Sequence, residues 1–157
     1  MIKLYHGSDV EVKKIDLSFS LMRKDFGPGF YLSSNLKQAR AFARYKADRP
    51  KSSTHKAVVS TFEVDNSCFT DGSLRIKRFS CYSEEWIDFI EEYREKKETD
   101  FDVIIGPIAN DDVRTKFAMY EMGEITKDEL LESLKYKHVT FQYCFKTEIA
   151  ISKLNKI

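Results

Sequence analysis

Apolar and polar residues alternate in several short runs of the chain, and between these runs apolar residues recur at helical spacing. Alternation predicts strands with one buried face, and a short continuous apolar run predicts a buried strand. On these criteria strands are expected at residues 2–6, 29–33, 57–64, 103–105 and 139–145. A weaker strand is expected around Cys68.

Helices are expected where apolar residues recur every three to four positions after a capping residue. Such segments lie at about 35–48, 84–97, 111–122 and 126–134. Ser34 and Ser83 are the expected N-caps of the first two, and the segment from Thr126 to Glu129 fits a capping box. Because strands and helices follow in a mixed order, without regular strand–helix–strand repetition, we expect one α+β domain over residues 1–157.

The composition describes a globular chain with ample core material. Of its 157 residues 42% are hydrophobic, and they include 12 Phe and 8 Tyr. No apolar run approaches the roughly 20 residues of a membrane span, and the first residues, MIKLYHGS, lack a signal-peptide pattern. Three cysteines without CxxC spacing indicate neither a disulfide framework nor a zinc site. We expect a cytoplasmic protein without a membrane segment or a bound metal.

The net charge of +1 conceals an uneven distribution. Residues 1–60 hold 12 Lys and Arg against 5 Asp and Glu, whereas residues 61–157 hold 14 against 20. Two solvated faces of opposite sign would explain this. Alternatively, the N-terminal third attracts an anion such as a pyrophosphate or a nucleic-acid strand.

The glycine-rich stretch from Asp25 to Ser34 is the most informative local feature. Gly27 and Gly29 carry no Cβ, so the backbone there can approach a flat ligand closely. His6 stands at the end of a predicted strand, and Gly7 after it would expose a backbone N–H and C=O. A carboxamide needs that pair, since it carries one donor and one acceptor side by side.

On local pattern alone, each of these side chains has a structural explanation as well. His6 shares a strand face with apolar residues and Tyr31 lies in an aromatic strand, so both also fit a protein core. Gln142 lies on a strand whose other face is apolar, and its amide must find partners or remain exposed.

Taken together, the motifs resemble the ADP-ribosyltransferase superfamily, in particular the poly(ADP-ribose) polymerase-like branch, whose signature is His, Tyr and Glu on three strands. Tyr5-His-Gly-Ser8 looks like its first motif and Gly27-Pro-Gly-Phe-Tyr-Leu32 like its second. Gln142 stands where the third motif has Glu. Nearly the whole chain is also similar to a family of small bacterial proteins that share the glycine bend, the Gly-Pro-Ile-Ala-x-Asp-Asp stretch at 106–112 and the late glutamine.

The resemblance implies a mixed or antiparallel split β-sheet flanked by helices, with NAD as the substrate. It implies that His6 contacts the adenosine-side ribose, that Gly7 clamps the nicotinamide carboxamide, and that Tyr31 stacks on the nicotinamide ring. Ala39 falls where the polymerases offer a serine hydroxyl to the carboxamide. The implied catalytic residues are His6, Tyr31 and Gln142. The implied NAD-binding residues are His6, Gly7, Ser8, Gly29, Tyr31 and Phe42.

The implied activity is that of an NAD-dependent mono-ADP-ribosyltransferase, a pentosyl transferase acting on a protein or nucleic-acid acceptor. Chain elongation is not expected, because Gln142 supplies a dipole where the polymerases have a full charge. Glu148, six residues later, is a conceivable substitute. Small bacterial proteins of this type often look like toxins of toxin–antitoxin or phage-defence systems, which implies a neutralising antitoxin as partner.

Two other functions remain open at this point. The glutamine favours a non-catalytic module that binds NAD, ADP-ribose or a partner strand. RNA 2′-phosphotransfer on a related fold would need arginines around the cleft, for which Arg23, Arg40 and Arg44 are the candidates.

The remaining charged candidates are ambiguous. Asp111 and Asp112 either cap a helix or lie near the acceptor. The charged residues before the glycine bend either contact the pyrophosphate or the target, or they are simply solvated. They are Arg23, Lys24 and Asp25.

Overall fold

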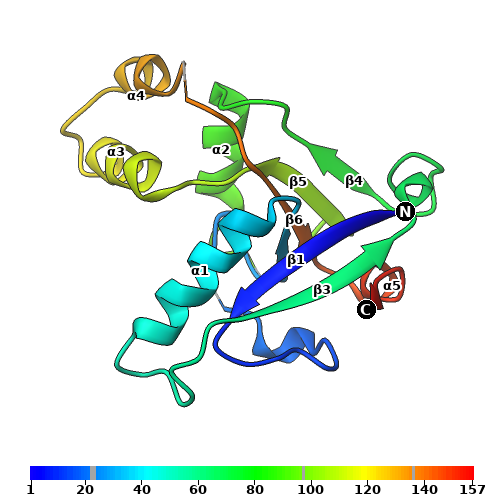
Figure 1. Ribbon diagram of the computed structural model, residues 1–157. Coiled ribbons are helices and arrows are strands. Elements are labelled where there is room, and N and C mark those ends of the chain that lie inside the picture. The colour runs from blue at the N-terminus through cyan, green and yellow to red at the C-terminus, as the bar shows by residue number, and fades with distance from the viewer. Residues whose placement is uncertain (22–23, 97, 136) are drawn as a thin grey trace.

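The computed structural model describes residues 1–21, 24–96, 98–135 and 137–157 (Figure 1). Its strands are β1 (Ile2–Ser8), β2 (Phe30–Ser33), β3 (Val58–Val64), β4 (Ile76–Arg78), β5 (Val103–Pro107), β6 (Phe141–Phe145) and β7 (Asn155–Lys156). Its α-helices are α1 (Leu36–Asp48), α2 (Glu84–Tyr93), α3 (Asp111–Glu121), α4 (Lys127–Leu134) and α5 (Glu148–Ile151). Short 3-10 helices cover Leu17–Phe19 and Asn66–Phe69.

The strands form one mixed sheet in the order β4-β5-β6-β2-β1-β3-β7. Neighbours are antiparallel except β4 and β5, which are parallel. β1 pairs with β3 along its whole length from Ile2 to Ser8, but it joins β2 only at Tyr5 and Ser33. The expected α+β class is confirmed, and the centre of the sheet is its most weakly paired junction.

The two faces of the sheet carry separate cores, because side chains alternate along each strand. Ile104 and Cys144 point into a core formed with α2, α3 and α4. Val103 and Phe145 point into the opposite core, where Phe69 and Ala150 contribute from the Asn66–Phe69 helix and α5. The alternation predicted for residues 139–145 therefore holds over the part that forms β6.

Helix α1 lies against β1 at very short range. Its buried residues Ala39, Ala43 and Ala47 are small, and Gly7 faces them from the strand. A Cβ on Gly7 would lie 2.2 Å from the Ala39 carbonyl oxygen and 2.9 Å from the Ala43 amide nitrogen. Only glycine permits this approach, which brings the α1 side chains close to the end of β1.

The helix starts follow side-chain capping, with one correction. The Ser83 cap and the Thr126–Glu129 capping box are confirmed. The cap of α1 is Asn35 and not Ser34, because the Asn35 side chain accepts the Gln38 amide hydrogen. Helix α2 ends at Tyr93; the predicted end near Lys97 falls on a residue outside the described part.

Two strand predictions also need correction. The segment around Cys68 is a 3-10 helix, because the Asp65 side chain accepts the Ser67 amide hydrogen and turns the chain. The strand predicted to end at residue 105 continues through Pro107, where Gly106 pairs with Gln142 and Pro107 with Phe141. The longer strand brings the Pro107 carbonyl within reach of the Gln142 side chain.

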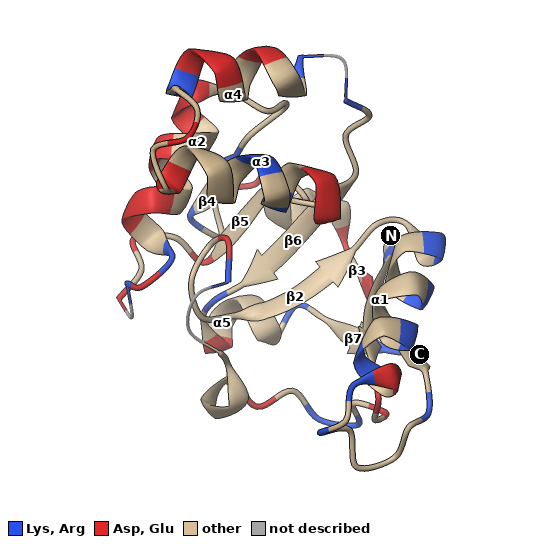
Figure 2. Ribbon diagram, turned by 90° about the vertical axis from the view of Figure 1, so that its left-hand side faces the viewer, with Lys and Arg blue, Asp and Glu red and all other residues tan. Residues whose placement is uncertain are grey.

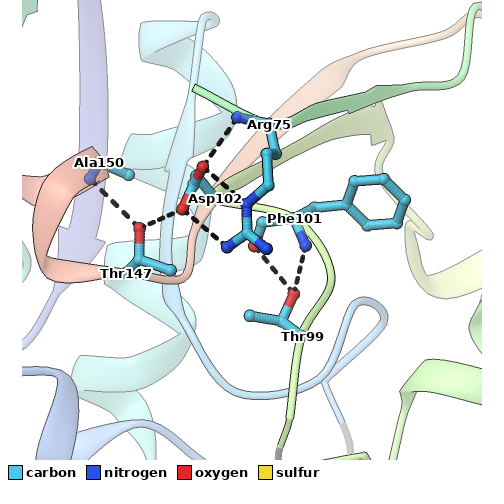
Figure 3. Close-up of polar contacts among 6 residues, drawn as sticks. All are labelled: Arg75, Thr99, Phe101, Asp102, Thr147 and Ala150. Atoms are coloured by element: carbon cyan, nitrogen blue, oxygen red, sulfur yellow. Dashed lines mark hydrogen bonds and ion pairs between the residues drawn. The ribbon is translucent and has the colours of Figure 1, made fainter. Parts of the chain in front are cut away.

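The start of β5 is fixed by a buried carboxylate (Figure 3). Asp102 accepts hydrogen bonds from the Arg75 backbone at 2.7 Å and from the Thr147 hydroxyl at 2.8 Å. The Arg75 guanidinium also donates to both carboxylate oxygens at 3.2 Å. Because Thr147 caps α5, the network ties β5 to the segment after β6.

No helix within the described ranges combines the length and apolar character that crossing a bilayer requires.

Candidate functional site

A cavity of about 920 Å³ opens where β1, β2, β6, α1 and the glycine bend meet. Residues of β1 and β2 line it beside the single residue pair that these strands share, and residues of α1 line it as well. All the side chains and backbone positions expected to bind or act on NAD line this one cavity: His6, Gly7, Ser8, Gly29, Tyr31, Phe42 and Gln142.

The imidazole of His6 has a fixed orientation and is uncharged near neutral pH. Its Nδ1 lies 2.7 Å from the Tyr31 carbonyl oxygen, and its ring stacks on Phe30 with centroids 4.4 Å apart. Because a carbonyl only accepts, Nδ1 carries the hydrogen and Nε2 is left as an acceptor. Burial lowers the pKa of His6 to about 4, and the charges of Lys46 and Lys24 add to this decrease.

This pKa makes protein stability depend on pH. Between pH 6.5 and 4 the unfolded chain binds a proton at His6 that the folded chain does not, so the unfolding free energy falls as the pH is lowered. Between pH 7 and pH 4.5 we expect the free energy of unfolding to fall by about 2 kcal/mol more in the wild type than in His6→Gln. Urea denaturation at both pH values measures the difference, and parallel losses in the two proteins would refute the assignment.

Tyr31 uses its hydroxyl to hold the glycine bend in place. The hydroxyl donates to the Gly27 carbonyl at 2.5 Å and accepts from the Phe26 amide at 3.0 Å. Gly27 has φ 75°, a backbone conformation that residues other than glycine rarely adopt. Lys146 donates to the Pro28 carbonyl at 2.7 Å from the other side of the bend. Burial raises the Tyr31 pKa well above its ordinary value, so the phenol stays protonated.

Gln142 is buried, and its amide has one possible orientation. Its Nε2 donates to Asp25 Oδ2 at 3.0 Å and to the Pro107 carbonyl oxygen at 3.1 Å. Both partners only accept hydrogen bonds, so the nitrogen must face them. Among the described residues the Oε1 atom has no hydrogen-bond partner, so the side chain retains a fixed acceptor.

Two lysines flank the ring of Phe42. The ammonium of Lys24 lies 5.3 Å from the Phe42 centroid and 6.0 Å from the Tyr31 centroid, and that of Lys46 lies 5.2 Å from the Phe42 centroid. Neither lysine forms an ion pair within the described ranges. Burial, then the charges of Lys24 and Arg49, lowers the pKa of Lys46 to about 8.

The cavity therefore lies in the basic part of the molecule. Figure 2 shows Lys and Arg along α1 and Asp and Glu over α2 and α4. Of the basic residues of α1, Lys46 lines the cavity. Sequence reasoning assigned no individual role to Lys46, although its position one helical turn after Phe42 and the basic N-terminal third were both visible.

Several charged candidates lie elsewhere. Glu148 is exposed at the start of α5 and is not among the residues lining the cavity, so it does not compensate for Gln142 there. Arg40 and Arg44 are exposed on α1 and line neither described cavity, and Arg23 falls outside the described residues. Of the described arginines, Arg94 and Arg114 line the cavity, and neither is one of the three that the sequence offered for RNA 2′-phosphotransfer.

A smaller cavity of about 250 Å³ adjoins the first and shares Phe42 and Arg114 with it. Asp111 lines this second cavity, in the first turn of α3, whose N-cap is Asn110. Asp112 forms an ion pair with Lys137 instead. Asp111 is therefore the one of the two neighbouring aspartates that borders the site.

Fold and site together define an α+β protein with a mixed sheet and one large cavity over its centre. The chain belongs to the family described as "Protein of unknown function (DUF3990)", because the model of that family matches residues 2–155. No curated protein and no solved structure gave a significant match.

Proposed function

We propose that the cavity binds NAD and that the protein is a mono-ADP-ribosyltransferase. The observation that carries this proposal is the convergence of His6, Tyr31 and Gln142, from three different strands, on one cavity. A volume of about 920 Å³ suits a ligand of dinucleotide size. An ADP-ribosyltransferase-like split sheet is part of the same proposal, and the single-pair junction of β1 with β2 supports it.

The surroundings of the cavity suit the parts of NAD. The nicotinamide ring is a flat cation, and Tyr31 and Phe42 already hold the Lys24 ammonium within cation–π distance. On binding, the pyridinium would replace that ammonium, with its carboxamide on the Gly7 backbone. Lys24 and Lys46 would then face the pyrophosphate, and the free Nε2 of His6 would accept from a ribose hydroxyl.

The proposed reaction breaks the bond between the ribose C1 and the nicotinamide nitrogen. The bonding electron pair stays on nicotinamide, which leaves as a neutral molecule, and the ribose becomes an oxocarbenium-like cation. An acceptor oxygen or nitrogen then bonds to C1 and loses its proton. Gln142 Oε1 would accept from the adjacent 2′-hydroxyl, an interaction that strengthens as the sugar loses electron density.

The direct test is nicotinamide release. Purified protein, incubated with NAD and with extract from its target cells, should release nicotinamide and leave labelled ADP-ribose on a macromolecule. Treating the product with nuclease or protease identifies the acceptor class. A folded protein that neither binds NAD nor releases nicotinamide under these conditions is not a transferase.

Lys46 offers a test of the pyrophosphate contact. Lys46→Met keeps the apolar stem and removes the charge, and we expect it to raise the KM for NAD about tenfold while changing kcat less. Lys37→Met is the matched control, because Lys37 is an exposed residue of α1 that lines neither described cavity. Equal KM values for the two variants would contradict the contact.

The biological setting is part of the same proposal and comes from the resemblance to small bacterial ADP-ribosyltransferases. A cytoplasmic toxin of a toxin–antitoxin or phage-defence system would consume NAD, modify a protein or nucleic acid, and require a cognate antitoxin. Its expression should inhibit growth, and Gln142→Ala should relieve the inhibition.

A non-catalytic module that binds NAD or ADP-ribose is the second candidate function, and the uncharged Gln142 favours it. Such a module would bind NAD without releasing nicotinamide.

A further inference from the structure

Gln142 lies beside a carboxylate, Asp25, to which the resemblance to the polymerases assigns no catalytic role. Asp25 precedes the glycine bend, is half-buried and lines the same cavity. We infer that Asp25 and Gln142 act together as one anionic hydrogen-bond acceptor. Asp25 is the positioning residue, which holds and polarises the Gln142 amide. This inference rests on the proposed function. The pair would then supply the negative charge that a glutamate gives the polymerases.

The geometry couples the two side chains directly. Asp25 Oδ2 accepts from Gln142 Nε2 at 3.0 Å, and the Pro107 carbonyl fixes the same amide at 3.1 Å. A charge-assisted hydrogen bond of this kind draws electron density toward the amide oxygen. Oε1, which has no hydrogen-bond partner among the described residues, consequently becomes a stronger acceptor.

Among the described residues, no cation is in direct contact with the carboxylate of Asp25. Within the described ranges Asp25 forms no ion pair, and its carboxylate accepts from the neutral Gln142 amide. A carboxylate in a partly buried cavity acts on a developing cation more strongly than one in water. The oxocarbenium-like ribose, held by Gln142, would experience that field.

The other carboxylates that line the cavity in the described structure have different partners. Glu11 forms an ion pair with Lys156, and Asp16 caps the Leu17–Phe19 helix by accepting the Ser18 amide hydrogen. Asp25 is thus the lining carboxylate that contacts Gln142.

The test exchanges the two functional groups. Asp25→Asn keeps a side chain of the same shape and removes the charge. The double variant Asp25→Asn with Gln142→Glu returns one carboxylate and one amide to the pair in reversed positions. The probe is a hydroxylated pyrrolidinium iminosugar, a cationic mimic of the oxocarbenium ribose, titrated by calorimetry. Nicotinamide release is measured in parallel.

We expect Asp25→Asn to weaken iminosugar binding and slow nicotinamide release by about tenfold or more, since hydrogen bonds to charged groups are the stronger ones. The double variant should recover most of both losses. A purely structural role for Asp25 would lower the melting temperature of Asp25→Asn but leave iminosugar binding by the folded variant unchanged. Glu148→Gln, which removes an exposed carboxylate outside the cavity, should behave as the wild type.

Each outcome decides the inference. It is wrong if wild-type protein does not bind the iminosugar, if Asp25→Asn binds it equally well, or if the double variant shows no recovery. Thermal melts of each variant exclude unfolding as the cause of a loss. If the wild type binds the iminosugar and the variants follow the expected order, but NAD yields no nicotinamide, the proposed function fails and the anionic pair stands.

Discussion

Replacing Gln142 by leucine is expected to lower kcat for nicotinamide release by about 100-fold or more. The change preserves side-chain volume but removes the acceptor aimed at the ribose, and loss of one preorganised polar group at a reacting centre typically costs this much. It also deprives Asp25 and the Pro107 carbonyl of their shared donor, so we expect about 1–3 kcal/mol of destabilisation.

Tyr143→Phe is the control for this variant. Tyr143 lies on the same strand, β6, but faces the opposite core, so the loss of its hydroxyl should leave kcat near the wild-type value. Measurements are made well below the melting temperature of each protein. If the Gln142→Leu protein is folded and releases nicotinamide at the wild-type rate, Gln142 has no part in the reaction.

The second large effect is expected at Gly7. Gly7→Ala places a methyl group 2.2 Å from the Ala39 carbonyl oxygen, so α1 must move away from β1. We expect a loss of about 3 kcal/mol in the free energy of unfolding, at the upper end of the usual cost of overpacking. NAD binding should weaken as well, because the same movement displaces Phe42 and Lys46.

Gly72→Ala separates this steric effect from the general cost of replacing glycine. Gly72 has φ 81°, and no atom lies within 4 Å of the position that its Cβ would take, so its replacement costs about 1 kcal/mol through backbone conformation alone. Urea denaturation of both variants makes the comparison. A Gly7→Ala protein as stable as Gly72→Ala would show that the contact between α1 and β1 is loose.

Local chemistry accounts for the parts of the fold that the sequence predicted well. The Thr126–Glu129 capping box and the Ser83 cap depend on residues three positions apart, so both are readable from sequence. Strict alternation likewise placed Gln142 and Cys144 on the face opposite Tyr143. A competing local interaction explains the wrong prediction around Cys68. The Asp65 side chain accepts the Ser67 amide hydrogen there, so the segment forms a 3-10 helix and not the expected strand.

Long-range pairing explains what the sequence could not provide. Asp25 and Gln142 are 117 positions apart and meet only because β2 and β6 are neighbours in the sheet. The sequence could not show that Lys46 lines the cavity, because this depends on the packing of α1 against β1. The short strands β4 and β7, of three and two residues, carry too little pattern to be recognised in advance.

The central claim, that this cavity binds NAD, is tested most directly by calorimetric titration with an uncleavable analogue. Replacing the ring oxygen of the nicotinamide ribose by methylene prevents the oxocarbenium from forming, so binding is measured without turnover. We expect one molecule to bind per chain, with about tenfold weaker binding for Phe42→Ala and unchanged binding for Arg44→Ala. No binding by the wild type, or equal binding by Phe42→Ala, would contradict the account.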